Sequence, residues 1–146
     1  MTLDFGVLLD GYCSDMTRTV HLGKASQRER DVYHSVLEAQ QAAVAAIAPG
    51  VSCGDVDEAA RSVLRKAKLG NSFTHSTGHG VGLEIHEGPR IAAGQKQLLE
   101  PGMVVTVEPG VYLPGEFGVR IEDMVLVMAN GGKVLTAASP KSWIEL

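Results

Sequence analysis

Three histidines lie within twelve residues of the stretch T-H-S-T-G-H-G-V-G-L-E-I-H-E, at His75, His79 and His86. Imidazole binds metals and exchanges protons near neutral pH, so this stretch predicts a metal site or acid–base chemistry. The glycines between the histidines allow the backbone to come close to a bound group. The spacing differs from the helical H-E-x-x-H zinc motif, and Leu83 stands where a dinucleotide fingerprint needs its third glycine. Those two motifs are therefore excluded.

Two aspartates near the N-terminus flank a predicted hairpin. The dipeptide Asp10-Gly11 is typical of a tight two-residue turn. Pairing through that turn places Asp4 opposite Thr17 and puts Asp4 and Asp15 on one face as diagonal neighbours. Such neighbours lie about 7–8 Å apart, within joint reach of a metal or a metal pair. Two surface aspartates on a hairpin remain the alternative.

Two glutamates follow or interrupt apolar strands further along the chain. Glu108 ends the predicted strand that begins at Met103, and Glu122 lies within a predicted strand from Val119 to Met128. An unpaired carboxylate in such surroundings is costly, so each is expected to have a cation or a hydrogen-bonding partner. Alternation places Arg120 on the same face as Glu122, which makes a simple ion pair the alternative.

Together these residues form a set of four carboxylates and one imidazole. Sites rich in carboxylates with one nitrogen ligand suit manganese, iron or cobalt better than a closed structural zinc site. Several carboxylates can also bridge two cations, as in two-metal hydrolytic sites. The candidate ligands are Asp4, Asp15, His79, Glu108 and Glu122.

The elements that must position these side chains are strands and two helices. Ser26 to Glu29 is a capping box that opens a helix ending before Pro49-Gly50. A second helix begins at Ser52 or Asp55 and stops at Gly70. Both helices are interpreted as scaffold, and neither His34 nor His21 is interpreted as a ligand. The other predicted elements are strands over 3–9 and 11–20, a turn at 131–132 and a last strand over 133–137.

Composition narrows the class of protein. The chain has 146 residues, of which 45% are hydrophobic and 21% charged, as in a single globular domain. A net charge of −4 without a basic stripe predicts no nucleic-acid partner. The apolar run 42–48 is too short to cross a bilayer, so no membrane partner is expected. Cys13 and Cys53 are isolated, and no signal peptide is recognised, which favours a cytoplasmic protein.

Four motifs resemble one family in order and spacing: D-F-G with S-D-M-T-R-T, H-S-T-G-H-G-V-G-L-E-I-H-E-G-P, T-V-E-P-G-V-Y, and G-V-R-I-E-D. Together they resemble the proline-specific branch of the pita-bread metallopeptidases, the Xaa-Pro dipeptidases (prolidases) and Xaa-Pro aminopeptidases. The resemblance covers nearly the whole chain. It implies an α+β pita-bread fold, with a curved antiparallel sheet backed by helices.

The resemblance also implies a role for each candidate residue. Asp15 and Glu122 would bridge two divalent ions, expected to be manganese, with cobalt, iron and zinc as alternatives. A hydroxide held between the metals would attack the peptide bond before a proline at the second position of a small peptide. Glu108 would handle the proton of that water and His86 would steady the tetrahedral intermediate. The remaining implied substrate contacts are His75 and Arg120, and the implied metal ligands are the five named above.

The sequence begins at the first strand that carries a metal ligand. Residues 1–146 are therefore expected to be a partial catalytic domain, without the family's N-terminal domain and most of its first half. The expected partner is that missing half or a second copy of the chain. Two other functions stay open: a methionine aminopeptidase-like exopeptidase and a non-catalytic pita-bread binding module. The motifs around Glu122 and His86 favour the proline-specific branch, and retention of all five ligands disfavours a non-catalytic module.

Overall fold

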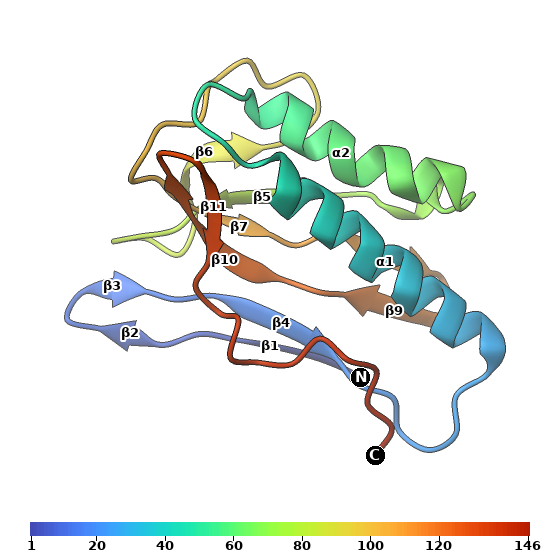
Figure 1. Ribbon diagram of the computed structural model, residues 1–146. Helices are drawn as coiled ribbons and strands as arrows, with labels where there is room; N and C mark the ends of the chain where they lie inside the picture. Colours follow the sequence, from blue (N-terminus) through green and yellow to red (C-terminus); the bar gives the residue numbers. More distant parts are fainter.

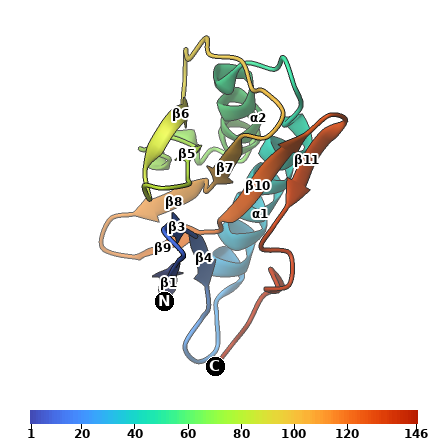
Figure 2. The ribbon, with the colours of Figure 1, turned by 90° about the vertical axis from the view of Figure 1, so that its left-hand side faces the viewer.

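The computed structural model describes residues 1–146 and shows an α+β fold, as the sequence predicts. Helices α1 (Gln27–Ala46) and α2 (Cys53–Lys66) lie side by side and pack along one face of an antiparallel sheet (Figure 1). The two termini lie close together at one end of the molecule (Figure 2). No helix has the length and apolarity needed to cross a membrane.

Both helices begin at the predicted caps. The Ser26 side chain accepts from the backbone N–H of Glu29, and the Glu29 side chain accepts from the backbone N–H of Ser26. The Ser52 hydroxyl caps α2 in the same way by accepting from Asp55 N. A short 3-10 helix, η1 (Gly70–Ser72), follows α2. The predicted apolar stripe of α1 is buried: Val32, Val36, Ala39, Ala43 and Ile47.

A five-stranded antiparallel sheet forms the centre of the molecule, in the order β11-β10-β7-β5-β6. Strands β5 and β7 approach unusually closely, because a Cβ added to Gly78 would lie 1.9 Å from the Thr106 carbonyl oxygen. Glycine is therefore the residue that lets the histidine segment lie against β7. The strands are β5 (Gly78–Gly80), β6 (Glu87–Ile91), β7 (Val104–Val107), β10 (Asp123–Met128) and β11 (Gly131–Val134).

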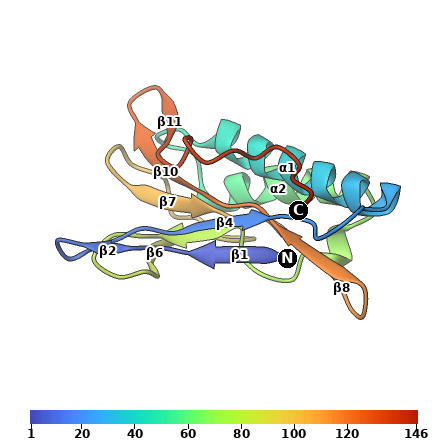
Figure 3. The same ribbon diagram turned by 90° about the horizontal axis from the view of Figure 1, so that it is seen from below.

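A long β-ribbon holds the first 19 residues on the side of the molecule opposite α2 (Figures 1 and 3). Asp4 pairs with Thr17 and Leu8 with Cys13, so the predicted register is confirmed. The two long predicted strands are interrupted, because the Ser14 hydroxyl takes the Val7 N–H in place of a regular ladder bond. The ribbon consists of β1 (Thr2–Phe5), β2 (Leu8–Leu9), β3 (Tyr12–Cys13) and β4 (Met16–Thr19).

The predicted continuous strand from Val119 to Met128 is wrong. Strand β9 (Phe117–Arg120) pairs with β8 (Gly110–Leu113), whereas β10 pairs with β7 and β11. The chain leaves one sheet and enters the other at Ile121 and Glu122, where the Glu122 N–H donates to the Thr17 carbonyl oxygen at 3.1 Å. Arg120 and Glu122 therefore do not share the face of one strand.

The last predicted turn is shifted by two residues. Met128 pairs directly with Gly131, so Ala129 and Asn130 form the turn and both glycines belong to β11. A side chain on Gly132 would lie 2.8 Å from Val125 Cγ1. Close packing against β10 and α1, rather than turn geometry, explains why glycine occupies that position.

Candidate active site

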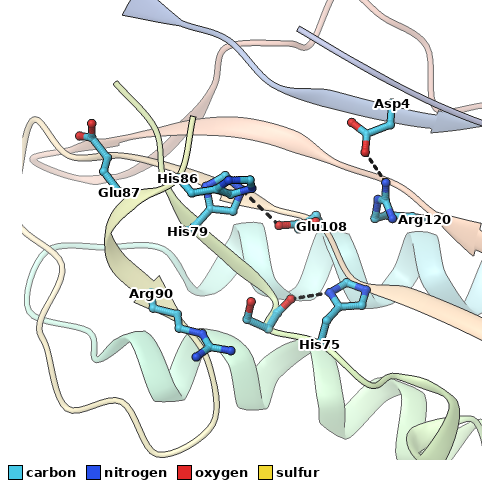
Figure 4. Close-up of a pocket in the computed structure, with 9 residues that line it drawn as sticks. Asp4, His75, His79, His86, Glu87, Arg90, Glu108 and Arg120 are labelled. Carbon is cyan, nitrogen blue, oxygen red and sulfur yellow. Dashed lines mark hydrogen bonds and ion pairs between the residues drawn. The ribbon is translucent and has the colours of Figure 1, made fainter. Parts of the chain in front are cut away.

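Three of the five candidate ligands, Asp4, His79 and Glu108, line an open, polar pocket of about 510 Å3. None of the residues that line it is hydrophobic. Figure 4 shows His79, His86 and Glu108 at its centre, with Asp4 and Arg120 on one side and Arg90 on the other. The lining residues are Asp4, His75, Ser76, His79, His86, Glu87, Arg90, Glu108 and Arg120.

The five candidate ligands come from five segments of the fold. Asp4 lies in β1 and Asp15 follows β3; His79 lies in β5; Glu108 follows β7 and Glu122 precedes β10. Both glutamates thus lie directly beyond the end of a strand of the central sheet, Glu108 after β7 and Glu122 before β10. Three groups have ligand atoms within 4.8 Å of one another: Asp15–His79–His86, His79–Glu108–Glu122 and Asp4–Asp15–Glu122.

The His79 ring presents a lone pair to the carboxylates. Its Nδ1 lies 2.9 Å from the Gly80 carbonyl oxygen, which can only accept, so Nδ1 carries the proton. Its Nε2 lies 3.4 Å from Glu108 Oε1 and 3.7 Å from Asp15 Oδ2. Burial lowers the pKa of His79, which favours the neutral ring. A neutral Nε2 beside two carboxylate oxygens is the arrangement of a metal ligand set.

Glu122 is the most deeply buried of the candidate ligands, at 2% exposure. Thr17 Oγ1 donates to its Oε2 at 2.6 Å, but its Oε1 is buried without a hydrogen-bond partner. Burial raises the pKa of Glu122 to about 8; the Thr17 hydrogen bond opposes this, and nearby carboxylates add to it. An unpartnered buried carboxylate oxygen among acidic neighbours fits a cation between them.

The two remaining central carboxyls are also shifted toward the protonated form. Burial raises the pKa of Glu108 to about 7, with Arg120 opposing the shift. Burial, followed by the charge of Asp4, raises the pKa of Asp15. The donor set therefore consists of Asp4, which pairs with Arg120, three carboxylates without an ion pair to Lys or Arg, and one neutral imidazole. That set fits divalent metals of the manganese type.

Arg120, Tyr112 and His75 form a hydrogen-bonded chain along one wall of the pocket. Arg120 NH1 donates to the Tyr112 hydroxyl at 2.9 Å, and that hydroxyl lies 3.1 Å from His75 Nε2. His75 Nδ1 donates to the Ser76 carbonyl oxygen at 2.8 Å, so the tyrosine hydroxyl donates to Nε2. Arg120 NH2 also pairs with the Asp4 carboxylate. Arg120 is thus bound to Asp4 and Tyr112 instead of the alternative partner Glu122.

His86 lies in the loop between β5 and β6, and its exposed ring contacts the edge of the His79 ring at a centroid distance of 4.4 Å. It faces the same pocket as Glu108 (Figure 4). The other two histidines are remote from the pocket lining, as predicted. His21 pairs with Glu29 at 2.8 Å, and the His34 ring contacts Tyr33.

Sequence reasoning missed several residues in and around this site. Tyr112 lies in the T-V-E-P-G-V-Y motif, but the break between β7 and β8 separates it from Glu108, so alternation does not place its hydroxyl beside His75 and Arg120. Thr17 stands opposite Asp4 in the predicted register, so its hydroxyl could have been placed on the same face. Arg90 pairs with His79 across β5 and β6, and no local signal in the sequence indicates it.

The fold and the cluster together define a metallopeptidase scaffold: an antiparallel sheet backed by two helices, with carboxylates and a histidine gathered at one pocket. Residues 1–129 match metallopeptidase family M24, and the chain belongs to that family. Similar structures share the fold across almost the whole chain.

Several relatives are similar over most of the chain but are much longer. The chain is 48% identical over 136 residues to the Xaa-Pro dipeptidase of Pyrococcus furiosus, covering 93% of this chain and 39% of the relative. The solved Xaa-Pro dipeptidase from Bacillus anthracis superposes with a TM-score of 0.97 at 49% identity, over 99% of this chain and 41% of that one. The X-Pro aminopeptidase from Thermotoga maritima gives 0.95 at 41% identity, over 99% and 40%.

Proposed function

We propose that this chain carries the metal centre of a dinuclear metallo-exopeptidase that hydrolyses the bond before proline, in dipeptides or at peptide N-termini. The observation that carries the proposal is the convergence of three ligand groups, in which Glu122, Asp15 and His79 each belong to two groups. Two groups that share one carboxylate can hold two adjacent cations. The relatives named as Xaa-Pro dipeptidases support the substrate class.

We assign the five ligands as the motif resemblance implies. Asp15 and Glu122 would bridge two ions, since each is a carboxylate that belongs to two of the three groups, whereas His79, which also belongs to two, has one free nitrogen. The excess of carboxylates over imidazoles favours manganese, with cobalt, iron and zinc as alternatives. When bound, the two cations supply Lewis-acid activation of water and of the peptide carbonyl. The other ligands are Asp4, His79 and Glu108.

The protein's own groups would move the proton and steady the substrate. Glu108 Oε1 lies in the pocket beside His79, where a carboxylate can accept a proton from water and return it to the leaving nitrogen. His86 is exposed at the same pocket, where its ring can donate to the oxygen of the tetrahedral intermediate.

Specificity for proline follows from what that residue lacks. A bond before proline is a tertiary amide with no N–H to donate and a ring that fixes the backbone. The wall formed by His75, Tyr112 and Arg120 offers a fixed surface and a cation for the rest of the substrate. We therefore assign His75 and Arg120 to substrate binding.

The chain spans about two fifths of the length of these relatives. How the rest of the catalytic domain completes the pocket is therefore also a proposal. Side chains of the β2–β3 end of the ribbon are strongly exposed: Val7 66%, Leu8 70%, Leu9 69% and Tyr12 63%. We propose that residues 1–146 form part of a catalytic domain whose remainder covers this surface, with self-association in its absence. Sedimentation would show a concentration-dependent oligomer, and a monodisperse monomer would contradict this.

The proposed compartment is the cytoplasm, where the free thiols of Cys13 and Cys53 would stay reduced.

The test of the proposed function is a ratio of rates measured with the manganese-loaded protein. Cleavage of Ala-Pro is compared with cleavage of Ala-Ala and of a Met-Ala peptide, so that a low absolute rate does not affect the outcome. We expect Ala-Pro to be cleaved far faster than the other two. Equal rates, or a preference for N-terminal methionine, would instead favour a methionine aminopeptidase-like function.

A further inference from the structure

Helix α2 carries an ion pair that lies behind the pocket and does not line it. Asp57 is completely buried, and Arg61 one turn later donates to both of its oxygens, at 2.6 and 3.1 Å. A buried ion pair is seldom a net source of stability, because removing two charges from water is costly. The remaining contacts of this pair indicate what else it does.

Every other side-chain hydrogen bond of the pair goes to one short segment, residues 73–77. Arg61 donates to the carbonyl oxygens of Phe73 at 3.2 Å and His75 at 2.6 Å. Asp57 Oδ1 accepts from the Thr77 hydroxyl at 2.7 Å and from the Thr77 N–H at 3.3 Å. These backbone groups belong to no strand, so the ion pair supplies partners that an apolar pair could not.

The same segment leads directly to two residues of the proposed site. The Phe73 ring lies under the Arg61 guanidinium at 4.2 Å and contacts the edge of the His75 ring at 5.1 Å. The Thr77 carbonyl oxygen accepts from the Glu108 N–H at 2.7 Å. A single residue, Thr77, thus connects Asp57 to Glu108 by hydrogen bonds, and Arg61 is hydrogen-bonded to the backbone of His75.

We propose that Asp57 and Arg61 are positioning residues that fix His75 and, through Thr77, Glu108. Helix α2 is then part of the machinery of the site and more than scaffold. This inference rests on the proposed function for the roles of His75 and Glu108, but the hydrogen-bonded path itself does not.

The experiment compares Thr77→Val, Thr77→Ser and Asp57→Asn with the wild-type chain. Thr77→Val keeps the shape of the side chain but removes the hydroxyl that donates to Asp57, and Thr77→Ser restores that hydroxyl. Ser62→Ala is the matched control on α2, since the Ser62 hydroxyl bonds only to the Ala59 carbonyl oxygen. Manganese affinity, amide hydrogen exchange at Glu108 and thermal stability are measured for each.

We expect Thr77→Val and Asp57→Asn to weaken manganese binding by about tenfold, as loss of a partner behind a metal ligand commonly does. The Glu108 amide should exchange faster in both, and Thr77→Ser and Ser62→Ala should behave as wild type. Wild-type affinity and unchanged Glu108 exchange in Thr77→Val would overturn the proposal, whatever its melting temperature. If the wild-type chain binds no manganese, the proposed function fails. The positioning role is then decided by Glu108 exchange alone: faster exchange restored by Thr77→Ser supports it, and unchanged exchange overturns it.

Discussion

Glu122 and Asp123 are adjacent and both are buried, yet they lie in opposite electrostatic surroundings. Asp123 faces cations and donors on every side. Burial alone would raise the pKa of Asp123, but its hydrogen bonds hold it below the ordinary value of 3.8. Its partners are Arg18 at 2.8 Å, Thr136 at 2.8 Å, Gln40 at 2.9 Å and the ammonium group of Lys141.

Glu122 lies among the other candidate ligands and forms no ion pair with a protein cation. Its one side-chain partner is the Thr17 hydroxyl, its Oε1 has none, and its pKa is raised to about 8. Arg18 even donates to the Glu122 carbonyl oxygen at 2.5 Å while its charge is directed to Asp123. The protein thus neutralises one buried carboxylate internally and leaves its neighbour open. The proposed metal site predicts this difference, because bound cations would balance the charge on the Glu122 side.

The largest expected effect on stability comes from replacing Asp123, the carboxylate that protein cations neutralise. Asp123→Asn leaves the buried charge of Arg18 and the partly buried charge of Lys141 without a counterion, so the free energy of unfolding should fall by about 3–5 kcal/mol. Urea unfolding measures this. Asp31→Asn on the exposed face of α1 is the control and should change stability by less than about 0.5 kcal/mol. A small effect at Asp123 would mean that its ion pairs do not stabilise the fold.

Replacing Glu122, the carboxylate without a cation, should change the free energy of unfolding in the opposite direction. Glu122→Gln removes a carboxylate with an unsatisfied buried oxygen and gives its neighbours Asp15 and Glu108 an N–H donor. We therefore expect the metal-free protein to gain about 1–3 kcal/mol of stability. Urea unfolding in the presence of a chelator measures it. A loss of stability would show that Glu122 is satisfied without metal.

Stability should depend on pH in opposite directions for the candidate ligands Glu108 and Glu122 and for Asp123. Glu108 and Glu122 have folded pKa values of about 7 and 8, above the ordinary 4.5, so the unfolded chain loses their protons first as the pH rises. The free energy of unfolding of the metal-free protein should therefore fall between about pH 4.5 and 8. Asp123, with its lowered pKa, contributes stability that is lost as the pH falls below 3.8.

Unfolding curves over this range, with chelator and with manganese, measure the pH effect. Manganese should flatten the loss above pH 4.5, and Glu122→Gln should reduce it. A metal-free protein whose stability rises steadily across that window would contradict the raised pKa values.

The smallest expected effect comes from the hydroxyl group of Thr136. Thr136→Val removes a hydroxyl that donates to Asp123 Oδ1 at 2.8 Å and accepts from the Met124 N–H at 3.2 Å, while two cations remain beside Asp123. Stability should fall by about 1 kcal/mol, with manganese binding unchanged. Thermal unfolding and a metal titration measure the two quantities. Weaker metal binding would mean that the two sides are coupled.

Features set by local chemistry could be predicted from the sequence. The Asp10-Gly11 turn fixed the register that places Asp4 opposite Thr17, because a tight hairpin leaves one pairing. The capping residues Ser26 and Ser52 located both helix starts. The candidate ligands were found because carboxylates and histidine are unusual in apolar strands and glycine-rich loops.

Features set by contacts between distant segments could not be predicted. The break at Ile121 and Glu122 depends on a bond to Thr17, more than a hundred residues earlier in the chain. Alternation along one strand therefore suggested an ion pair between Arg120 and Glu122. In the structure, Arg120 pairs with Asp4 and donates a hydrogen bond to Tyr112. Residues that act across such breaks leave no periodic pattern to read.

The central claim is that Glu122 is left without a protein cation because it binds metal. Calorimetric titration with manganese of the wild-type chain, Glu122→Gln and Thr136→Val tests it most directly. We expect two ions per chain in the wild type and in Thr136→Val, and loss of tight binding in Glu122→Gln. Binding of as many ions by Glu122→Gln, with wild-type affinity, would contradict the claim.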